Sequence, residues 1–151
     1  MTTTVHGAGE LLAKAGDHLG YSDWLEITQD RIDAFADATN DHQWIHCDPA
    51  RAAAGPFGAT IAHGYLTLSL VVPWIEEILV IEDKKTSINY GLDKVRFPAP
   101  VPVGSKVRMG ASMAEATEVS GGVQIVLDCT IEIDGAERPA CVARVVLRHL
   151  F

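Results

Sequence analysis

The chain has 151 residues, which is enough for one ordinary domain, residues 1–151, with a sizeable hydrophobic core. Its formal charge of -8 at pH 7 argues against a nucleic-acid-binding surface, which would be basic, and leaves only a local basic cluster to hold a small anion. Three cysteines are an odd number without metal-ligand spacing, and residues 1–10 lack the basic start and apolar run of a signal peptide, so we expect a reduced, cytoplasmic protein.

The first forty residues predict short elements and one amphipathic helix. Residues 1–6 are predicted to be frayed, residues 10–14 to form a short helix, and residues 21–27 a first strand. Thr28 suits the N-cap of the next helix, because its hydroxyl can accept a hydrogen bond from a free backbone N–H. Apolar residues then recur at helical spacing up to Asn40, which tolerates the left-handed conformation that ends helices.

Residues 41–48 predict a loop, after which Asp48 and Pro49 predict the start of a short helix. Residues 60–79 are apolar on all sides, which predicts a central helix that is buried on every side. Pro73 should kink or divide it, because proline removes a backbone donor. Polar residues interrupt the run, so a membrane span is not predicted.

The second half alternates with the period of β-strands. The apolar set at Ile88, Tyr90 and Leu92 changes phase at Val95, which predicts a β-bulge near residues 93–94. Three further strands are predicted at residues 107–113, 123–133 and 141–147, with turns at residues 120–122 and 134–135. Helices followed by antiparallel strands predict an α+β fold in which a sheet curls around the central helix.

One loop holds two side chains that could act together in acid–base chemistry. A carboxylate at Asp41 can orient an imidazole at His46 or hold a water molecule between the two groups. The alternative is that both are ordinary loop residues exposed to solvent. The start of the central helix, at Gly64, strengthens the first interpretation, because free N–H groups there could polarise a carbonyl.

Other polar residues nearby fit structural roles better. His63 is predicted to bond near the helix start, and His42 and Trp44 to be packing or surface residues. Cys47 adjoins His46, but neighbouring side chains in an extended loop point apart, which disfavours a nucleophile. A metal site formed by His42, His46 and Asp48 would lack the usual spacing of ligands.

Several motifs resemble those of the MaoC-like (R)-specific enoyl-CoA hydratases, in particular the single-hotdog, nodulation-protein-N-like subgroup. The resemblance runs from about Tyr21 to the end of the chain and is carried by Asp41-His42-Gln43-Trp44-Ile45-His46-Cys47-Asp48, Phe57-Gly58, Ile61-Ala62-His63-Gly64-Tyr65-Leu66, and Val95-Arg96-Phe97-Pro98-Ala99-Pro100-Val101 with Val103-Gly104. Gln43 stands where the family usually has asparagine and Trp44 where it has proline. Val72 replaces a serine that some members have near the pocket.

The resemblance implies a hotdog fold and a homodimer with active sites at the subunit interface. It also implies reversible hydration of a trans-2-enoyl-CoA to an (R)-3-hydroxyacyl-CoA, with Asp41 and His46 as the catalytic pair and the Gly64 N–H on the thioester oxygen. No metal or cofactor is expected. The alternatives are an acyl-carrier-protein dehydratase of fatty-acid elongation, a thioesterase, and a binding subunit without activity. Candidates to contact the CoA phosphates are Lys84, Lys85, Lys94 and Arg96, and the candidates to shape the acyl tunnel are Val72, Trp74 and Ile75.

Overall fold

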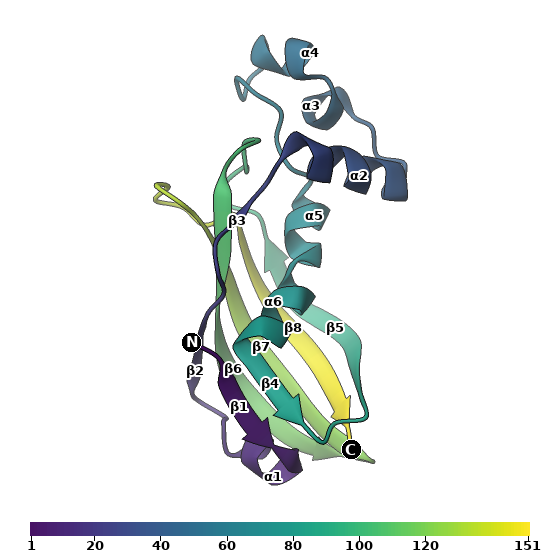
Figure 1. The fold of residues 1–151 in the computed structure, drawn as a ribbon, viewed down its shortest axis with the longest axis vertical. Helices are drawn as coiled ribbons and strands as arrows, with labels where there is room; N and C mark the ends of the chain where they lie inside the picture. Colours follow the sequence, from purple (N-terminus) through teal and green to yellow (C-terminus); the bar gives the residue numbers. More distant parts are fainter.

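A curved sheet wraps around two consecutive helices in the computed structural model, which describes residues 1–151 (Figure 1). The long strands are antiparallel and lie in the order β2-β6-β7-β8-β5, with the short β3 also pairing with β6. Their bounds are His18–Tyr21 for β2, Leu25–Glu26 for β3, Thr86–Arg96 for β5, Lys106–Val119 for β6, Gly122–Ile133 for β7 and Cys141–Leu150 for β8. The α+β arrangement predicted from the sequence is therefore confirmed.

The predicted strand patterns match the buried face of the sheet. Val107, Met109, Ala111 and Met113 of β6 are all at most 2% exposed. In β5 the pairing with β8 shifts between Leu92 and Lys94, as predicted, and also between Asn89 and Gly91. Both shifts bend β5, which is an edge strand of the sheet, and its side chains are exposed along most of its length.

The central helix is two helices, α5 (Gly64–Ser69) and α6 (Val71–Ile78). They are separated at Leu70, where the missing N–H of Pro73 leaves the Ser69 carbonyl without its intrahelical partner, so the predicted division is confirmed. The prediction of burial on every side is wrong for a single chain, because Tyr65 is 71% exposed and Val72 39% exposed. No helix is long and apolar enough to cross a membrane.

The N-terminal residues are ordered rather than frayed. β1 (Thr3–His6) pairs in parallel with β4 (Leu79–Glu82), and α1 (Gly7–Leu12) follows it. Residues 21–27 do not form one strand, because Ser22 interrupts the ladder. Its hydroxyl accepts a hydrogen bond from the Met109 N–H, and its own N–H donates to the Met109 carbonyl.

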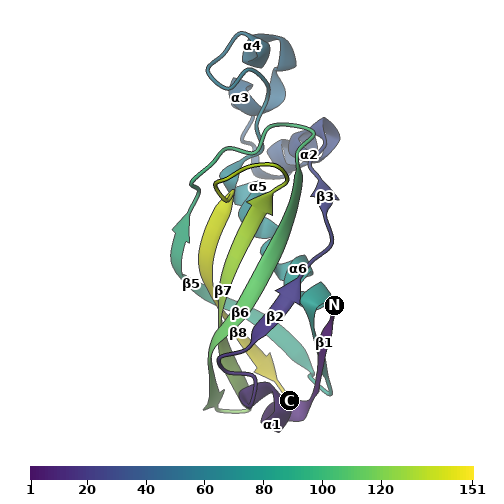
Figure 2. The ribbon, with the colours of Figure 1, turned by 90° about the vertical axis from the view of Figure 1, so that its left-hand side faces the viewer.

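Three helices form a cap over one end of the sheet (Figures 1 and 2). They are α2 (Gln29–Thr39), α3 (Trp44–Cys47) and α4 (Pro49–Ala53). Thr28 caps α2 by accepting a bond from the Arg31 N–H, and Asn40 ends it with φ 59°, as predicted. The prediction that residues 41–48 are all loop is wrong, because α3 lies within them and buries His46.

Candidate active site

The cap meets the start of α5 at a cavity of about 350 Å³. His46 of α3 and Gly64 of α5 both line it, and Phe97 lies at its edge. The remaining lining residues are small or apolar: Ile61, Ala62, Thr67, Ala99, Pro100, Val101 and Ala140. Three segments far apart in the sequence therefore enclose one hollow with few polar groups, an environment in which each polar group acts strongly.

His46 is held in one tautomer. Its side chain is only 7% exposed, and its Nδ1 lies 2.6 Å from the carbonyl oxygen of Ile61. A carbonyl only accepts hydrogen bonds, so Nδ1 carries the hydrogen and Nε2 keeps a free lone pair in the neutral ring. Burial lowers the pKa of His46 and neighbouring His63 lowers it further, while the Ile61 bond and Asp41 act in the opposite sense. The ring is thus neutral near pH 7 and able to accept a proton.

Asp41 lies close to His46, as the sequence predicted. The carboxylate is exposed, and side-chain ligand atoms of Asp41, His46 and His63 all lie within 4.8 Å of one another. The Gln43 N–H lies 3.4 Å from Asp41 Oδ1, a weak bond that turns the loop back towards α3. A solvent-facing carboxylate beside a buried neutral imidazole is an arrangement able to hold and deprotonate water.

Gly64 begins α5, and its N–H has no acceptor within the chain, as is usual for the first residue of a helix. A Cβ added to Gly64 would lie 3.3 Å from the ring of Phe97. The space on that side of Gly64 therefore holds an aromatic ring. Phe97 is 42% exposed, so the ring has room to yield by a few tenths of an ångström.

Gln29 of α2 is a site-supporting residue that the sequence did not reveal. Its side-chain amide donates to the His46 carbonyl at 2.8 Å and to Asp33 at 2.9 Å, and its amide oxygen accepts from the Thr60 hydroxyl at 2.6 Å. These bonds join α2, α3 and the segment before α5. A glutamine at the start of an amphipathic helix gives no sequence signal of this, since its partners are 17 and 31 residues away.

His42, Asp48 and Cys47 do not form a further reactive group with Asp41 and His46. His42 bonds to Asp37 on the exposed face of α2, and Asp48 caps α4 through the Arg51 N–H, so the metal set considered from the sequence does not assemble. Burial and nearby acidic groups raise the pKa of the Cys47 thiol, which disfavours a reactive thiolate.

The cluster that does assemble, Asp41, His46 and His63, has the ligand types of a metal site. The two imidazole rings are stacked, however, with centroids 3.8 Å apart and planes at 23°. A lone pair lies in the plane of its ring, so two rings stacked in this way cannot both direct a lone pair at one ion. The observed arrangement suits proton transfer better than chelation.

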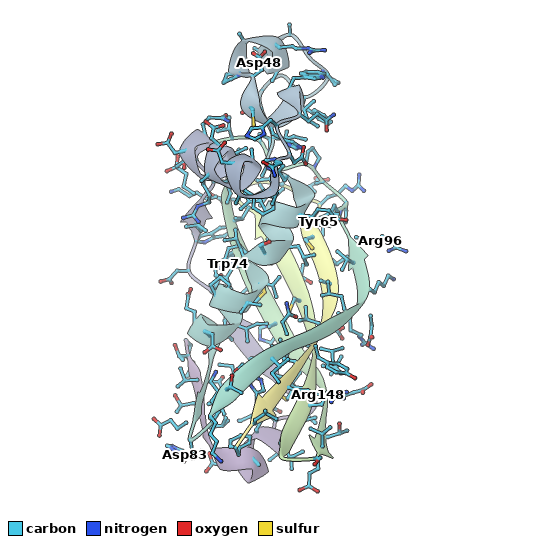
Figure 3. All side chains as sticks on the ribbon, turned by 90° about the vertical axis from the view of Figure 1, so that its right-hand side faces the viewer. Asp48, Tyr65, Trp74, Asp83, Arg96 and Arg148 are labelled. Carbon is cyan, nitrogen blue, oxygen red and sulfur yellow. The ribbon has the colours of Figure 1, made fainter.

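The basic residues considered for phosphate binding lie at two opposite ends of β5. Lys84 is paired with Glu76, and Lys85 bonds the Phe151 carbonyl, both at the end far from Gly64. Arg96 and Lys94 lie at the opposite end, next to Phe97, at roughly 3.3 Å per residue along the strand. Figure 3 shows Arg96 beside Tyr65, with Asp83 at the other extremity. Of these candidates, only the second pair lies at the end of β5 that leads into Phe97 and the cavity.

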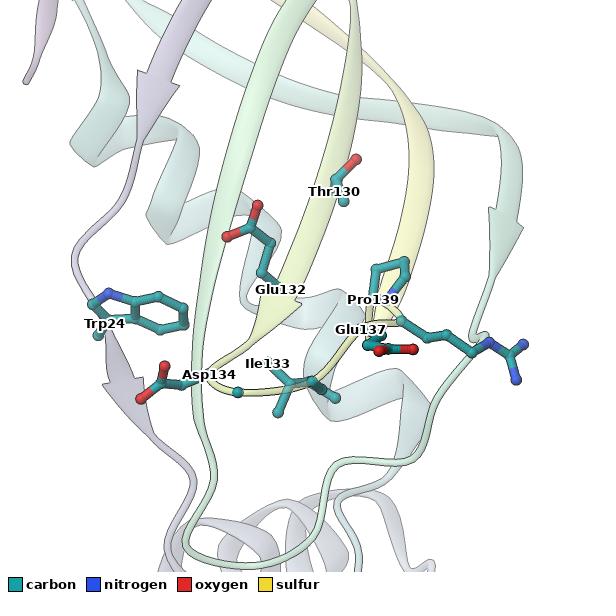
Figure 4. Close-up of a pocket in the computed structure, with 10 residues that line it drawn as sticks. Trp24, Thr130, Glu132, Ile133, Asp134, Glu137 and Pro139 are labelled. Carbon is teal, nitrogen blue, oxygen red and sulfur yellow. The ribbon is translucent and has the colours of Figure 1, made fainter.

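A groove of about 400 Å³ runs between the helices and β5, lined by Tyr65, Leu68, Ser69, Val71, Val72, Asn89, Leu92 and Val145. Val72 lines it as the sequence suggested, whereas Trp74 and Ile75 are buried in the core and line neither hollow. Another hollow of about 420 Å³ lies beside the β7–β8 connection and is bordered by Glu132, Asp134 and Glu137 (Figure 4). Those carboxylates would repel an anionic substrate.

Comparisons with known proteins converge on one family. The family described as MaoC like domain matches residues 10–131. The 3-hydroxyacyl-thioester dehydratase Z of Mycobacterium tuberculosis is 50% identical over 148 residues, covering 97% of this chain and 98% of that protein. Nodulation protein N of Rhizobium leguminosarum bv. viciae is 44% identical over 135 residues, covering 87% of this chain and 83% of that protein.

A solved structure gives the same picture of the fold. The (R)-hydratase from A. caviae involved in PHA biosynthesis superposes with a TM-score of 0.72 at 25% identity, covering 88% of this chain and 94% of that one. The resemblance stated from the sequence motifs is therefore confirmed.

Proposed function

The chain belongs to the MaoC-like domain family and is a hydro-lyase with the hotdog fold, and we propose that its reaction is the reversible hydration of a trans-2-enoyl-CoA to an (R)-3-hydroxyacyl-CoA. The observation that carries this proposal is that His46, with its free lone pair, and Gly64, with its unpaired N–H, line one largely apolar cavity, while a carboxylate oxygen of Asp41 lies within 4.8 Å of the imidazole. These are the groups that addition of water across a conjugated thioester requires.

In the proposed mechanism the water lies between Asp41 and His46. Its oxygen attacks C3 of the enoyl group while His46 Nε2 takes one of its protons, and Asp41 stabilises the imidazolium that forms. A proton then passes from this pair to C2, so that one water molecule is added overall. The charge that develops on the thioester oxygen is met by the Gly64 N–H, and one such donor is commonly worth ~10²–10³ in rate. No oxidant or reductant takes part.

The acyl chain and the carrier have separate places in this proposal. The groove beside Val72 and Leu92 takes the apolar acyl chain. It runs along α5, the helix that begins at Gly64, and few charged groups line it. Lys94 and Arg96 contact the phosphates of the carrier, because they alone of the basic candidates lie at the cavity end of β5. A thioester of an acyl carrier protein shares this chemistry and is the alternative substrate.

Loss of the conjugated-thioester absorbance of crotonyl-CoA and longer enoyl-CoAs tests the reaction, with free thiol measured in parallel. The proposal expects absorbance to fall without thiol release. Thiol release at the same rate would identify a thioesterase. Activity confined to carrier-protein thioesters would identify the elongation dehydratase, and inactivity on both would identify a binding subunit.

We further propose that a second copy of the chain covers β5 and the outer faces of α5 and α6, as the family resemblance implies. The apolar side chains exposed there are Tyr65, Val72, Ile88, Tyr90 and Leu92. β7 needs no second copy to cover its apolar residues Val123 and Ile125, since both are fully buried within one chain. Sedimentation equilibrium should give about twice the 16.3 kDa chain mass. A monomer at micromolar concentration would contradict this.

A further inference from the structure

His63 lies where α2, the Asp41 loop, α3 and the start of α5 meet. It precedes Gly64 as the N-cap of α5 and is 3% exposed. Its ring packs between Phe35 of α2, at a centroid distance of 4.9 Å, and His46 of α3, at 3.8 Å. Its Nε2 lies 2.9 Å from the main-chain carbonyl oxygen of Asp41, and its Nδ1 has no partner.

The contacts of His63 reach both members of the catalytic pair in different ways. Because the Asp41 carbonyl only accepts hydrogen bonds, His63 Nε2 carries a hydrogen and fixes the main chain from which the carboxylate projects. The stacked ring fixes the plane of His46, whose Nδ1 is already bound to Ile61. His63 is bonded to Gly64 in the chain, so both contacts are fixed relative to the N–H at the start of α5.

We propose that His63 is a positioning residue that sets the Asp41 carboxylate and the His46 imidazole at their working distance from the Gly64 N–H. The inference rests on the proposed function for what those three groups do, but its geometry stands independently. Misplacing a reacting group by about 1 Å commonly costs ~10²-fold in rate. One side chain that contacts the Asp41 loop, α3 and the start of α5 therefore controls the rate without touching the substrate.

His63 does not line the cavity, whereas His46 and Gly64 do. Substrate affinity should therefore survive changes at this position, while turnover should not. The side chains that act on the His46 ring are those of His63 and Asp41, together with the Ile61 carbonyl. Of these, only His63 both lowers the pKa of His46 and stacks on its ring.

Two variants separate the two contacts. His63→Phe keeps a stacked ring and removes the bond to Asp41, whereas His63→Gln can keep an N–H near the Asp41 carbonyl and removes the ring. Each should lower kcat on an enoyl-CoA by ~10-fold or more, with KM within about twofold of the wild type. His42→Gln is the matched control, because His42 directly follows Asp41, is exposed and hydrogen-bonds to Asp37 outside the cavity. It should retain wild-type kinetics.

The pH profile provides a readout that a purely structural role would not move. In His63→Gln the acid limb of kcat/KM and the nitrogen-15 titration of His46 should both move to higher pH, because a neighbour that lowers the pKa of His46 is gone. Unchanged kcat in both variants, or a raised KM with unchanged kcat, would overturn the proposal. So would an unmoved titration of His46.

A measurement on the wild-type protein decides the case even if neither variant folds. Nitrogen-15 histidine spectra should show His63 with its hydrogen on Nε2, and a hydrogen on Nδ1 alone would refute the proposed bond to Asp41. Inactivity of the wild type on every thioester would instead refute the proposed function, leaving the tautomer and the His46 titration to test the positioning role.

Discussion

Protonation of His149 should destabilise the fold as the pH falls below neutrality. Its side chain on β8 is 1% exposed, with Nδ1 2.9 Å from the Ser87 hydroxyl and Nε2 without a partner. Burial is the main cause that lowers its pKa from 6.5 to about 4; nearby Lys84 adds to the effect and Glu76 opposes it. The unfolded chain therefore binds a proton near pH 6.5, and the folded chain only near pH 4.

The stability provided by the neutral ring is complete above the unfolded pKa and is lost as the pH falls from 6.5 to about 4. A difference of roughly 2.5 pH units corresponds to about 3 kcal/mol. His149→Leu removes the titrating group and fills the same buried position. Urea unfolding of both proteins at one chain concentration, at about pH 7.5 and about pH 4, isolates this contribution from those of the other titrating groups.

The wild type should lose about 3 kcal/mol more than His149→Leu between those two pH values. His6→Gln serves as the control for replacing a histidine at the surface, because its side chain is 59% exposed beside Glu82 and such exposed pairs contribute little stability. Equal pH dependence in the wild type and His149→Leu would show that burial does not hold His149 neutral, and the reasoning would fail.

Four substitutions, at two glycines and one helix N-cap, extend the account. Gly64→Val should lower kcat/KM on an enoyl-CoA by ~10²–10³ with little change in Tm, and Gly64→Ala by less, because alanine presses on Phe97 by only a few tenths of an ångström; full kcat/KM in Gly64→Val would move the thioester site elsewhere. Gly122→Ala should cost at least about 3 kcal/mol in urea unfolding, since its Cβ would overlap the main-chain carbonyl of His149, and wild-type stability would contradict that packing. Thr28→Ala should cost about 1 kcal/mol by the same assay through loss of the bond to the Arg31 N–H, and no loss would show that the cap is dispensable.

Local signals predicted the elements whose causes lie within a few residues. Three such features are predicted correctly: the N-cap residue Thr28, the left-handed Asn40 and the division of the central helix at Pro73. Each depends only on neighbours in the sequence. The same holds for the bulge after Leu92, which follows from a phase change within one strand.

Features set by distant partners could not be predicted in this way. β1 is ordered because it pairs with β4, more than 70 residues further along the chain. The four-residue α3 depends on the bond from Gln29 and on burial of His46, because so short a helix has little stability of its own. The role of His63 needs three segments to be in place, and the sequence alone suggested only a local bond.

The exposure of Tyr65 and Val72 has a related origin. The prediction that these two side chains are buried holds only if a surface outside the chain covers them. A sequence pattern records that a residue is apolar but not whether its partner belongs to the same chain. The second copy proposed above would supply that surface, which makes the oligomeric state part of the account of the central helix.

The kinetics of Asp41→Asn and His46→Gln on an enoyl-CoA test the central claim most directly. Each variant should lose ~10²–10⁴ in kcat while its circular dichroism stays that of the wild type, and the double variant should lose far less than the product of the two, because both groups act on one water. Asp37→Asn, which changes an exposed carboxylate near the end of α2 that hydrogen-bonds to His42, is the matched control and should remain active. A near-wild-type rate in Asp41→Asn or His46→Gln would contradict the account.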